Sequence, residues 1–443
     1  MIFKSIKYQL LTFFIMLSGW GYAQNEIEYN QLKLSEAIEI GRQNNKKIQI
    51  SALKTNLAEL KENDLKNEKL PDIDFHTGFH VLSNLRQYED GFLKPSTKYI
   101  TPRVKYDFTL SAEIPVYLGG RIKNEEKKAT IETEISTLQM RKDERELRMQ
   151  IITAYLQALH LQEQQKLISD KIREDSVVIK QTEALKKNGL VTYNEVLRTE
   201  LQLSNHRMSF TELENEILII EHQIKTILSL PEKQEIHIDT NDLFTNETHL
   251  GLVDEMILEA ISNSENLKIA QDDLNLKELD KKITKANTLP KITAGAEYGY
   301  NYPNFMFFPP EKYLNRNGMI GINISIPLSN FFKNKQKLQM ADRRISIAKL
   351  EIEEKEERLR HEVYTANKRL EESVDKIKIA EEAIDQAKEN YRIVRTKYVN
   401  KLSLITELID ADNAYLEAQS NLISLQINKQ LKYYQLQYVL GNL

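Results

Sequence analysis

The sequence predicts a mixed fold of long α-helices and transmembrane β-strands, arranged as two tandem repeats. Residues 121–187 contain neither proline nor glycine and would form roughly 100 Å of helix. Adding 212 to each residue number maps positions 115–228 onto 327–440 without a gap, which indicates a duplicated unit. Within each repeat, two further segments alternate apolar and polar residues, as strands do.

The first 23 residues have the features of a secretory signal peptide. Lys4 and Lys7 give a positive start, residues 10–17 are apolar, and Gly21-Tyr22-Ala23 is a small-residue cleavage site. A membrane-anchor helix is the alternative, but this apolar run is too short to cross about 30 Å of hydrocarbon. We therefore expect an exported protein. No later segment is apolar enough to span a membrane as a helix, so a membrane-spanning part would have to consist of strands.

The composition excludes several classes of protein. The net charge is −4, and Lys and Glu are evenly mixed with no basic cluster, so we expect no nucleic-acid binding. There are 0 cysteines, which excludes disulfides and a cysteine-linked lipid anchor. With 41% hydrophobic residues, the chain does not have the composition of a disordered protein.

We expect a first repeat over 24–230, a linker over 231–250 and a second repeat over 251–443. The first repeat opens with a helix from Leu34 to Leu70, for which Ser35 is a plausible N-cap. The same segment recurs from residue 252 with an offset of 219 instead of 212. The difference in offset places an insertion in a loop between the opening helix and the second strand.

Each repeat then contains two expected strands. Their expected positions are about 72–83 and 104–118 in the first repeat and about 291–302 and 318–330 in the second. The unbroken alternation over 104–118 corresponds to roughly 50 Å of strand. Strands of this length are typical of outer-membrane barrels. A soluble sheet with one buried face is the alternative, but it explains neither the strand length nor the signal peptide.

Four strands cannot close a barrel, because about eight is the smallest number that does. The chain must therefore oligomerise if it spans a membrane. Geometry alone leaves a dimer, a trimer or a tetramer open.

Each repeat ends in a long helical hairpin, expected over 121–230 and 333–440. The two hairpin tips are the tripeptides Asn188-Gly189-Leu190 and Asn400-Lys401-Leu402. Gly189 stands where a helix would end in a left-handed C-cap, which leaves Leu190 exposed. An exposed apolar tip suggests a docking surface, although a simple turn is nearly as good an explanation.

The two return helices carry apolar seams typical of coiled coils. In the second hairpin the seam consists of Leu404, Leu408, Ala411, Tyr415, Ala418, Leu422 and Leu425. In the first hairpin Thr199 and His206 interrupt the equivalent seam. A second stripe in the second hairpin is polar and contains Glu407, Asp410, Glu417 and Asn421. This stripe is a solvated outer face or, if the helices close into a tube, part of its inner wall.

No enzymatic constellation emerges. His361-Glu362 lacks the second histidine of a zinc-protease helix, and Gly119-Gly120 is not followed by the lysine and serine of a phosphate loop. We expect no catalytic residues, no cofactor and no metal site.

Short motifs recur in the same order in both repeats: Leu70-Pro71, Ile114-Pro115 with Gly119-Gly120-Arg121, Leu289-Pro290 and Ile326-Pro327. The stretch from Tyr398 to Ala411, with Glu407-Leu408-Ile409-Asp410-Ala411, is similar to the pattern Tyr-x-x-Gly-x-x-x-x-x-Asp-Val-Leu-Asp-Ala, although Lys401 replaces its glycine. Together these features resemble the TolC-type outer-membrane efflux family over essentially the whole mature chain.

The resemblance implies a homotrimer, with a 12-stranded barrel in the outer membrane of a Gram-negative bacterium and a helical tunnel in the periplasm. It implies a passive duct that works with a periplasmic adaptor and an inner-membrane pump. The family's acidic ring falls on Glu407 and Asp410, its latch tyrosine on Tyr398, and a first-repeat aspartate on Glu195. The latch arginine falls on Ser403, so the same salt bridge cannot form.

The adaptor-docking motif of the family falls on Asn188, Gly189 and Leu190 and, less faithfully, on Asn400, Lys401 and Leu402. Two other functions remain open: a stand-alone diffusion porin, which leaves the long hairpins unexplained, and a soluble periplasmic coiled-coil scaffold, which leaves the alternating strands unexplained. The sequence does not identify the exported substrate, or whether the pump is driven by protons or by ATP.

Overall fold

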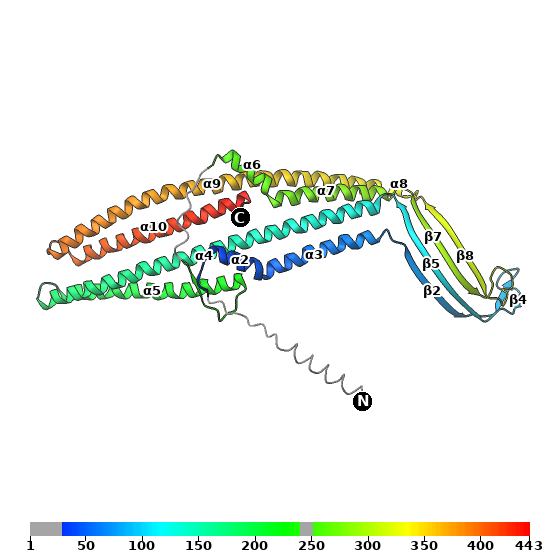
Figure 1. The fold of residues 1–443 in the computed structure, drawn as a ribbon, viewed down its shortest axis with the longest axis horizontal. Coiled ribbons are helices and arrows are strands. Elements are labelled where there is room, and N and C mark those ends of the chain that lie inside the picture. The colour runs from blue at the N-terminus through cyan, green and yellow to red at the C-terminus, as the bar shows by residue number, and fades with distance from the viewer. Residues whose placement is uncertain (1–28, 240–250) are drawn as a thin grey trace, which may run out of the picture. The chain divides into compact units, whose positions relative to one another are not determined.

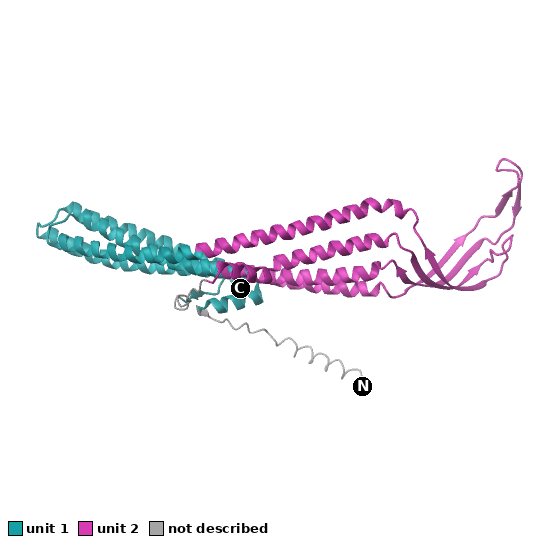
Figure 2. Cartoon of the chain, turned by 90° about the horizontal axis from the view of Figure 1, so that it is seen from above, with its two compact units in different colours: residues 1–45, 147–249, 370–434 teal, residues 46–146, 250–369, 435–443 magenta. Residues whose placement is uncertain are grey.

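The computed structural model describes residues 29–239 and 251–443 (Figure 1). The expected signal peptide and the second half of the expected linker lie outside the described residues. The chain forms two compact units (Figure 2). Unit 1 consists of residues 1–45, 147–249 and 370–434, and unit 2 of residues 46–146, 250–369 and 435–443. Each unit therefore takes segments from both sequence repeats.

The opening helix of each repeat is broken in two, where the sequence predicted one continuous helix. The four pieces are α2 (Leu34–Asn44), α3 (Lys46–Asn67), α6 (Val253–Asn263) and α7 (Glu265–Ala286). Asn45 interrupts the first pair in an extended conformation, and its side-chain amide donates to the Ile227 carbonyl at 2.8 Å. In the second repeat, the Ser264 hydroxyl caps α7 by accepting from the Leu267 amide at 3.3 Å. The N-cap of α2 is Lys33 and not the expected Ser35.

The long hairpins are formed by four helices, α4 (Arg121–Lys187), α5 (Tyr193–Leu228), α9 (Lys335–Val399) and α10 (Ile405–Leu440). The short helix α8 (Asn330–Lys333) precedes α9. The absence of proline and glycine between residues 121 and 187 allows α4 to continue for 67 residues. Both α4 and α9 pass through both units.

Unit 2 contains an antiparallel sheet in the order β2-β5-β7-β8 (Figure 1). Its strands are β2 (Asp72–Val81), β5 (Val104–Leu118), β7 (Lys291–Tyr302) and β8 (Asn315–Ser325). β8 begins and ends earlier than the strand predicted over 318–330. β2 ends before residue 83, the predicted end of the first strand. β8 ends before Pro327, which has no amide hydrogen for a ladder bond.

The register of this sheet separates an apolar face from a polar one. One row across the four strands contains Ile73, Ala112, Ala296 and Ile320. The neighbouring row, on the opposite face, contains Asp74, Ser111, Glu297 and Met319. The apolar face is uncovered within the chain, since Ile73 is 66% exposed on one edge strand and Ile320 is 90% exposed on the other.

Four short strands were not predicted. β1 (Tyr29–Leu32) pairs in parallel with β6 (Ile236–Ile238), and β3 (Leu85–Tyr88) pairs with β4 (Ser96–Tyr99). β6 lies in the expected linker, which is therefore partly structured.

The core of unit 1 forms around α4. Ile152, Tyr155 and Leu159 are at most 1% exposed. The Tyr155 hydroxyl lies 2.9 Å from the carbonyl oxygens of Leu32 and Asp239, next to the β1–β6 pair. Each large side chain buried in this way stabilises the folded chain by about 1.5–3 kcal/mol.

Candidate functional site

The tips of the two hairpins have the same backbone geometry. At the first tip, Gly189 has φ +69° and the Leu190 amide donates back to the Leu185 carbonyl at 2.9 Å. At the second tip, Lys401 has φ +64° and the Leu402 amide donates to the Lys397 carbonyl at 2.8 Å. Both are helix ends with a left-handed residue, as the sequence predicted for Gly189.

Side chains reinforce both tips. The Asn188 side-chain amide donates to the Ala184 carbonyl at 3.0 Å, and the Asn400 side-chain amide donates to the Thr396 carbonyl at 2.9 Å. Because both tips are ordered by their own hydrogen bonds, the apolar residues that follow are held outward. Leu190 is 45% exposed and Leu402 is 77% exposed.

A hydrogen bond joins the two hairpins close to the tips. The Tyr398 hydroxyl on α9 donates to Glu195 Oε2 on α5 at 3.3 Å. The other oxygen, Glu195 Oε1, accepts from the Thr192 amide at 3.4 Å and so caps α5. Burial raises the pKa of the Tyr398 hydroxyl. Two of the four residues expected at the gate therefore meet within one chain.

The other two expected gate residues, Glu407 and Asp410, lie exposed on α10. Ser403 occupies the position of the family's latch arginine, and its hydroxyl, just before α10 begins, donates to Glu407 Oε2 in the first turn of that helix. Glu407 and Asp410 are three residues apart, so they share one face of α10. The buried residues Leu408 and Ala411, which are 7% and 4% exposed, lie on a different face of the same helix.

Several polar residues that sequence reasoning missed lie between the hairpins. The Lys171 ammonium on α4 is 2.6 Å from Asp412 Oδ1 on α10 and 2.8 Å from Glu174 Oε2. Within the first hairpin, His206, which the sequence marks only as a break in the apolar seam, has its Nδ1 2.7 Å from Asp175 Oδ2. The sequence of α4 could have indicated these contacts, because four of its polar residues recur at the spacing of a buried coiled-coil seam. These residues are Gln164, Lys171, Asp175 and Thr182, and all four are buried.

The electrostatics of Lys171 follow from this arrangement. Burial alone would lower its pKa, but the hydrogen bonds and charges of Asp412 and Glu174 outweigh burial and raise the pKa of Lys171 above the ordinary 10.5. Lys171 is therefore charged at neutral pH, although its side chain is only 4% exposed.

In the part of the chain that the structure describes, no three His, Asp or Glu side chains are grouped so that they could hold a metal ion. Among these same residues, no helix combines the length and the apolar content needed to cross a membrane.

A sequence model described as "Outer membrane efflux protein" matches residues 37–229 and 256–442, most of both repeats. The chain belongs to the outer membrane efflux protein family. This efflux protein is similar to the pyoverdine export outer membrane protein OpmQ of Pseudomonas putida, with 20% identity over 413 residues, covering 90% of this chain and 83% of that protein.

Solved structures share the fold of this efflux protein. The outer-membrane channel OprN superimposes with a TM-score of 0.78 at 16% identity, over 92% of this chain and 90% of that one. CusC superimposes with a TM-score of 0.76 at 15% identity, covering 96% and 95% of the two chains. The MtrE outer membrane channel of Neisseria gonorrhoeae, solved in an open state, has a TM-score of 0.74 at 17% identity, covering 92% and 88%. The expected fold, a TolC-type channel subunit with two repeats, is therefore confirmed.

Proposed function

We propose that this efflux protein is the passive outer-membrane exit duct of a tripartite efflux or secretion system in a Gram-negative bacterium. The observation that carries the proposal is the combination, in one chain of this family, of a sheet with an uncovered apolar face and long hairpins with exposed apolar tips. The sheet suits a lipid environment, and the hairpins suit a periplasmic conduit. A relative named for pyoverdine export supports an export role.

The open sheet supports assembly from several copies. β2 and β8 are edge strands, and their unpaired backbone groups cannot remain exposed to lipid. Three copies of the 4-stranded sheet would give twelve strands, enough to close a barrel. A single copy falls short of the roughly eight strands that closure needs.

The helices of unit 2 also carry apolar stripes that are uncovered in a single chain. On α3 the stripe consists of Ile50, Leu53, Leu57 and Leu60, each more than half exposed. On α9 it consists of Met340, Ile347 and Leu350, which are also more than half exposed. Burial of these stripes between neighbouring copies would extend the contacts between copies from the sheet into the helices.

The hairpin tips would form the periplasmic entrance and the docking surface. We assign adaptor docking to Asn188, Gly189, Leu190, Asn400, Lys401 and Leu402, because both tips hold a leucine outward on a rigid turn. Glu407 and Asp410 of three copies would place six carboxylates around the entrance. Tyr398 and Glu195 would hold the hairpins together beside them.

Two measurements test this function. The mass of the detergent-extracted protein should equal three mature chains, and a stable monomer would exclude the barrel. Tagged protein extracted from its native membrane should co-purify with a periplasmic adaptor encoded beside it. Membrane insertion without adaptor binding would favour a stand-alone diffusion porin, and recovery in the soluble periplasmic fraction would favour a coiled-coil scaffold.

A further inference from the structure

A short segment of unit 2, made of α8 and the first turn of α9, joins the sheet to the long helix (Figure 1). The Asn330 side-chain amide donates to the Asn287 carbonyl at 2.8 Å, and the Asn334 side-chain amide donates to the Thr284 carbonyl at 2.6 Å. Both carbonyls belong to the C-terminal end of α7, where carbonyl groups lack partners within the helix. The segment is therefore fixed to α7 by two side chains, and Asn334 is only 4% exposed.

Two aromatic rings of this segment project away from the protein. Phe331 is 57% exposed and Phe332 is 86% exposed. An exposed apolar row leads to them along β8 and the residues that follow it. Its members, each more than half exposed, are Ile320, Ile322, Ile324, Ile326 and Leu328. In a barrel strand, aromatic residues at the end of an apolar row are typical of the membrane surface, where the rings lie among lipid headgroups.

Three exposed lysines follow the rings: Lys333, Lys335 and Lys337. Residues 326–341 contain neither aspartate nor glutamate. Within residues 29–239 and 251–443, no carboxylate forms an ion pair with any of these lysines. Lys335 and Lys337 also stand in the first turn of α9, where the helix dipole favours carboxylates and disfavours cations. The lysines therefore do not stabilise the helix on which they stand.

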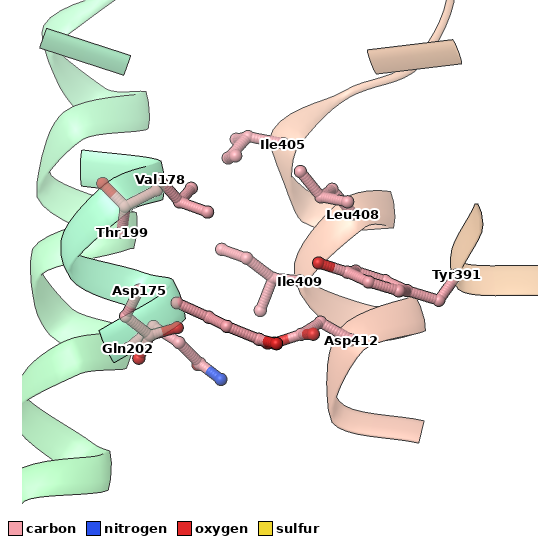
Figure 3. A pocket seen from close by; sticks show the side chains of 10 residues that line it. Asp175, Val178, Thr199, Gln202, Tyr391, Ile405, Leu408, Ile409 and Asp412 are labelled. Carbon is pink, nitrogen blue, oxygen red and sulfur yellow. The ribbon is translucent and has the colours of Figure 1, made fainter. Parts of the chain in front are cut away.

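The buried charges of unit 1 show the contrast. Asp175 and Asp412 point into one cavity of that unit (Figure 3). Asp175 Oδ2 lies 2.7 Å from His206 Nδ1, and Asp412 Oδ1 lies 2.6 Å from the Lys171 ammonium. Folding supplies a partner for each of these groups. The three lysines beside α8 gain no such partner, so they remain available to an anion from outside the chain.

The first repeat has glycines where the second has the aromatic rings. With the offset of 212, Phe331 and Phe332 correspond to Gly119 and Gly120. Gly119 packs so closely against α7 that a Cβ atom there would lie 2.7 Å from the Ala286 carbonyl oxygen. The duplicated unit can therefore make this junction without aromatic residues.

The charges of the two repeats differ in the same way. Arg121 lies 3.9 Å from Glu125, four residues along α4. The equivalent residues of the second repeat are Lys333 and Lys337, which have the same charge and repel each other. The second repeat has thus replaced an ion pair by two cations, directly after two exposed rings.

We propose that α8 and the start of α9 bind an anionic phospholipid of the outer membrane. Lys333, Lys335 and Lys337 hold its headgroup phosphate, and Phe331 and Phe332 contact its acyl chains. The site rests on the proposed function, because it needs β8 to cross the membrane. A neighbouring copy of the chain could cover the rings instead, but enclosing three lysines without carboxylates would be costly.

The lysines set the lipid preference. One lysine near an anionic membrane surface raises the affinity roughly fivefold. Three lysines should therefore prefer phosphatidylglycerol, which has a net negative charge, over zwitterionic phosphatidylethanolamine by at least about tenfold. High salt should weaken this preference, because it screens exposed charges.

Tryptophan fluorescence provides the test. The chain has 1 tryptophan, Trp20, which lies in the expected signal peptide, so Phe332→Trp places a unique fluorophore at the site. The full mature protein carrying this change is reconstituted into phosphatidylethanolamine vesicles that contain increasing amounts of a brominated lipid, which quenches tryptophan on contact. Brominated phosphatidylglycerol should reach half-maximal quenching at a mole fraction at least about tenfold lower than brominated phosphatidylethanolamine.

The triple change Lys333→Gln/Lys335→Gln/Lys337→Gln in this background should bring the ratio of the two mole fractions to about one, because it removes the charge that distinguishes the lipids. The matched control removes three other exposed lysines, Lys180→Gln/Lys349→Gln/Lys388→Gln, and should keep the preference. Val177→Trp, on a part of α4 that belongs to unit 1, should be quenched by neither lipid. If the Phe332→Trp protein does not assemble, native mass spectrometry of the parent and the triple lysine variant measures the same preference from the lipids that remain bound.

Three results would overturn the lipid site: equal quenching by both lipids in the parent background, an unchanged preference in the triple lysine variant, or a tryptophan that neither lipid quenches because a neighbouring copy covers it. The proposed duct is tested separately by conductance of the same vesicles fused with planar bilayers. A protein that conducts without the lipid preference would leave the duct standing and reject the site. A protein that does not enter vesicles at all would reject both.

Discussion

The two hairpins have nearly the same lengths but differ in what holds them together. α4 and α9 have 67 and 65 residues, and both return helices have 36. Their tips share one turn and one exposed leucine. The seam of the first hairpin contains Asp175 and His206, however, where the second hairpin has alanines.

This difference separates two requirements of the chain. The shared features, helix length and tip geometry, are those that the proposed conduit and the proposed docking surface would need. The feature that differs is the polar seam, which only the first hairpin has. This seam affects how the two hairpins are held relative to each other.

The largest expected effect concerns the shared tips. Leu190→Asp/Leu402→Asp should abolish export, because a charge at each tip removes the apolar contact available to an adaptor. The tips make few contacts within the chain, so the oligomer should still form and reach the outer membrane. Export of a cytotoxic compound by cells is the measurement. Val177→Asp, which replaces another exposed apolar side chain away from the tip, is the control. Full export by the double variant would reject tip docking.

The polar seam should show strong energetic coupling. His206→Ala leaves Asp175 buried without its partner and should lower the free energy of unfolding by about 3–5 kcal/mol. Asp175→Ala/His206→Ala makes the first seam resemble the second and should cost less than the single change. A thermodynamic double-mutant cycle by denaturant unfolding measures this. Additive effects would mean that the two residues act independently.

Alkaline pH should weaken the link between the hairpins. The pKa of Lys171 is raised above its ordinary 10.5, so the unfolded chain loses this proton first. The stabilisation by Lys171 is therefore complete below pH 10.5 and is lost as pH rises through the raised pKa, at about 1.4 kcal/mol per pH unit. Burial also raises the pKa of Tyr391, which adds a loss of the same sign.

In the variant Lys171→Met, the loss of stability at alkaline pH should no longer include the contribution of Lys171. The loss caused by Tyr391 should remain. Thermal unfolding in buffers on either side of pH 10.5 is the measurement. If stability falls equally steeply with pH in the variant and in the parent, folding does not stabilise the charged form of Lys171.

The smallest effect should come from exchanging the left-handed tip residues. Lys401→Gly relieves a side chain at φ +64° and should stabilise the second hairpin by about 1 kcal/mol. Gly189→Lys should destabilise the first hairpin by a similar amount, although the space around Gly189 is open. The measurement is the free energy of unfolding of each single variant and of the double variant that carries both changes. Changes of the same sign would show that the two tips are not equivalent.

Most of the fold was accessible from the sequence because its signals are repetitive. The alternation of Val104 to Leu118 determined a strand of that extent, and the absence of proline and glycine determined α4. Tertiary contacts determined what was missed. The break at Asn45 depends on its bond to Ile227, and β6 depends on pairing with β1, and neither partner is close in sequence.

The candidate site was predicted only in part. The left-handed conformation of Gly189 follows from local helix-end chemistry, so it could be predicted. The family resemblance alone named Tyr398 and Glu195 as gate residues, and the hydrogen bond between them was not predicted. Lys171 and Asp412 were missed because a charged residue on a long helix is usually solvated, and only the packing of four helices makes this pair buried.

We propose above all that the hairpin tips of several copies surround a water-filled entrance lined by Glu407 and Asp410. Single-channel recording of the parent and of Glu407→Ala/Asp410→Ala in planar bilayers tests it most directly. The parent should be cation-selective and blocked by a hexaammine cobalt(III) ion, because crowded carboxylates concentrate cations. The variant should lose much of its selectivity and bind the blocker about tenfold more weakly. Unchanged conductance, selectivity and block would contradict the account by placing these carboxylates outside the conduction path.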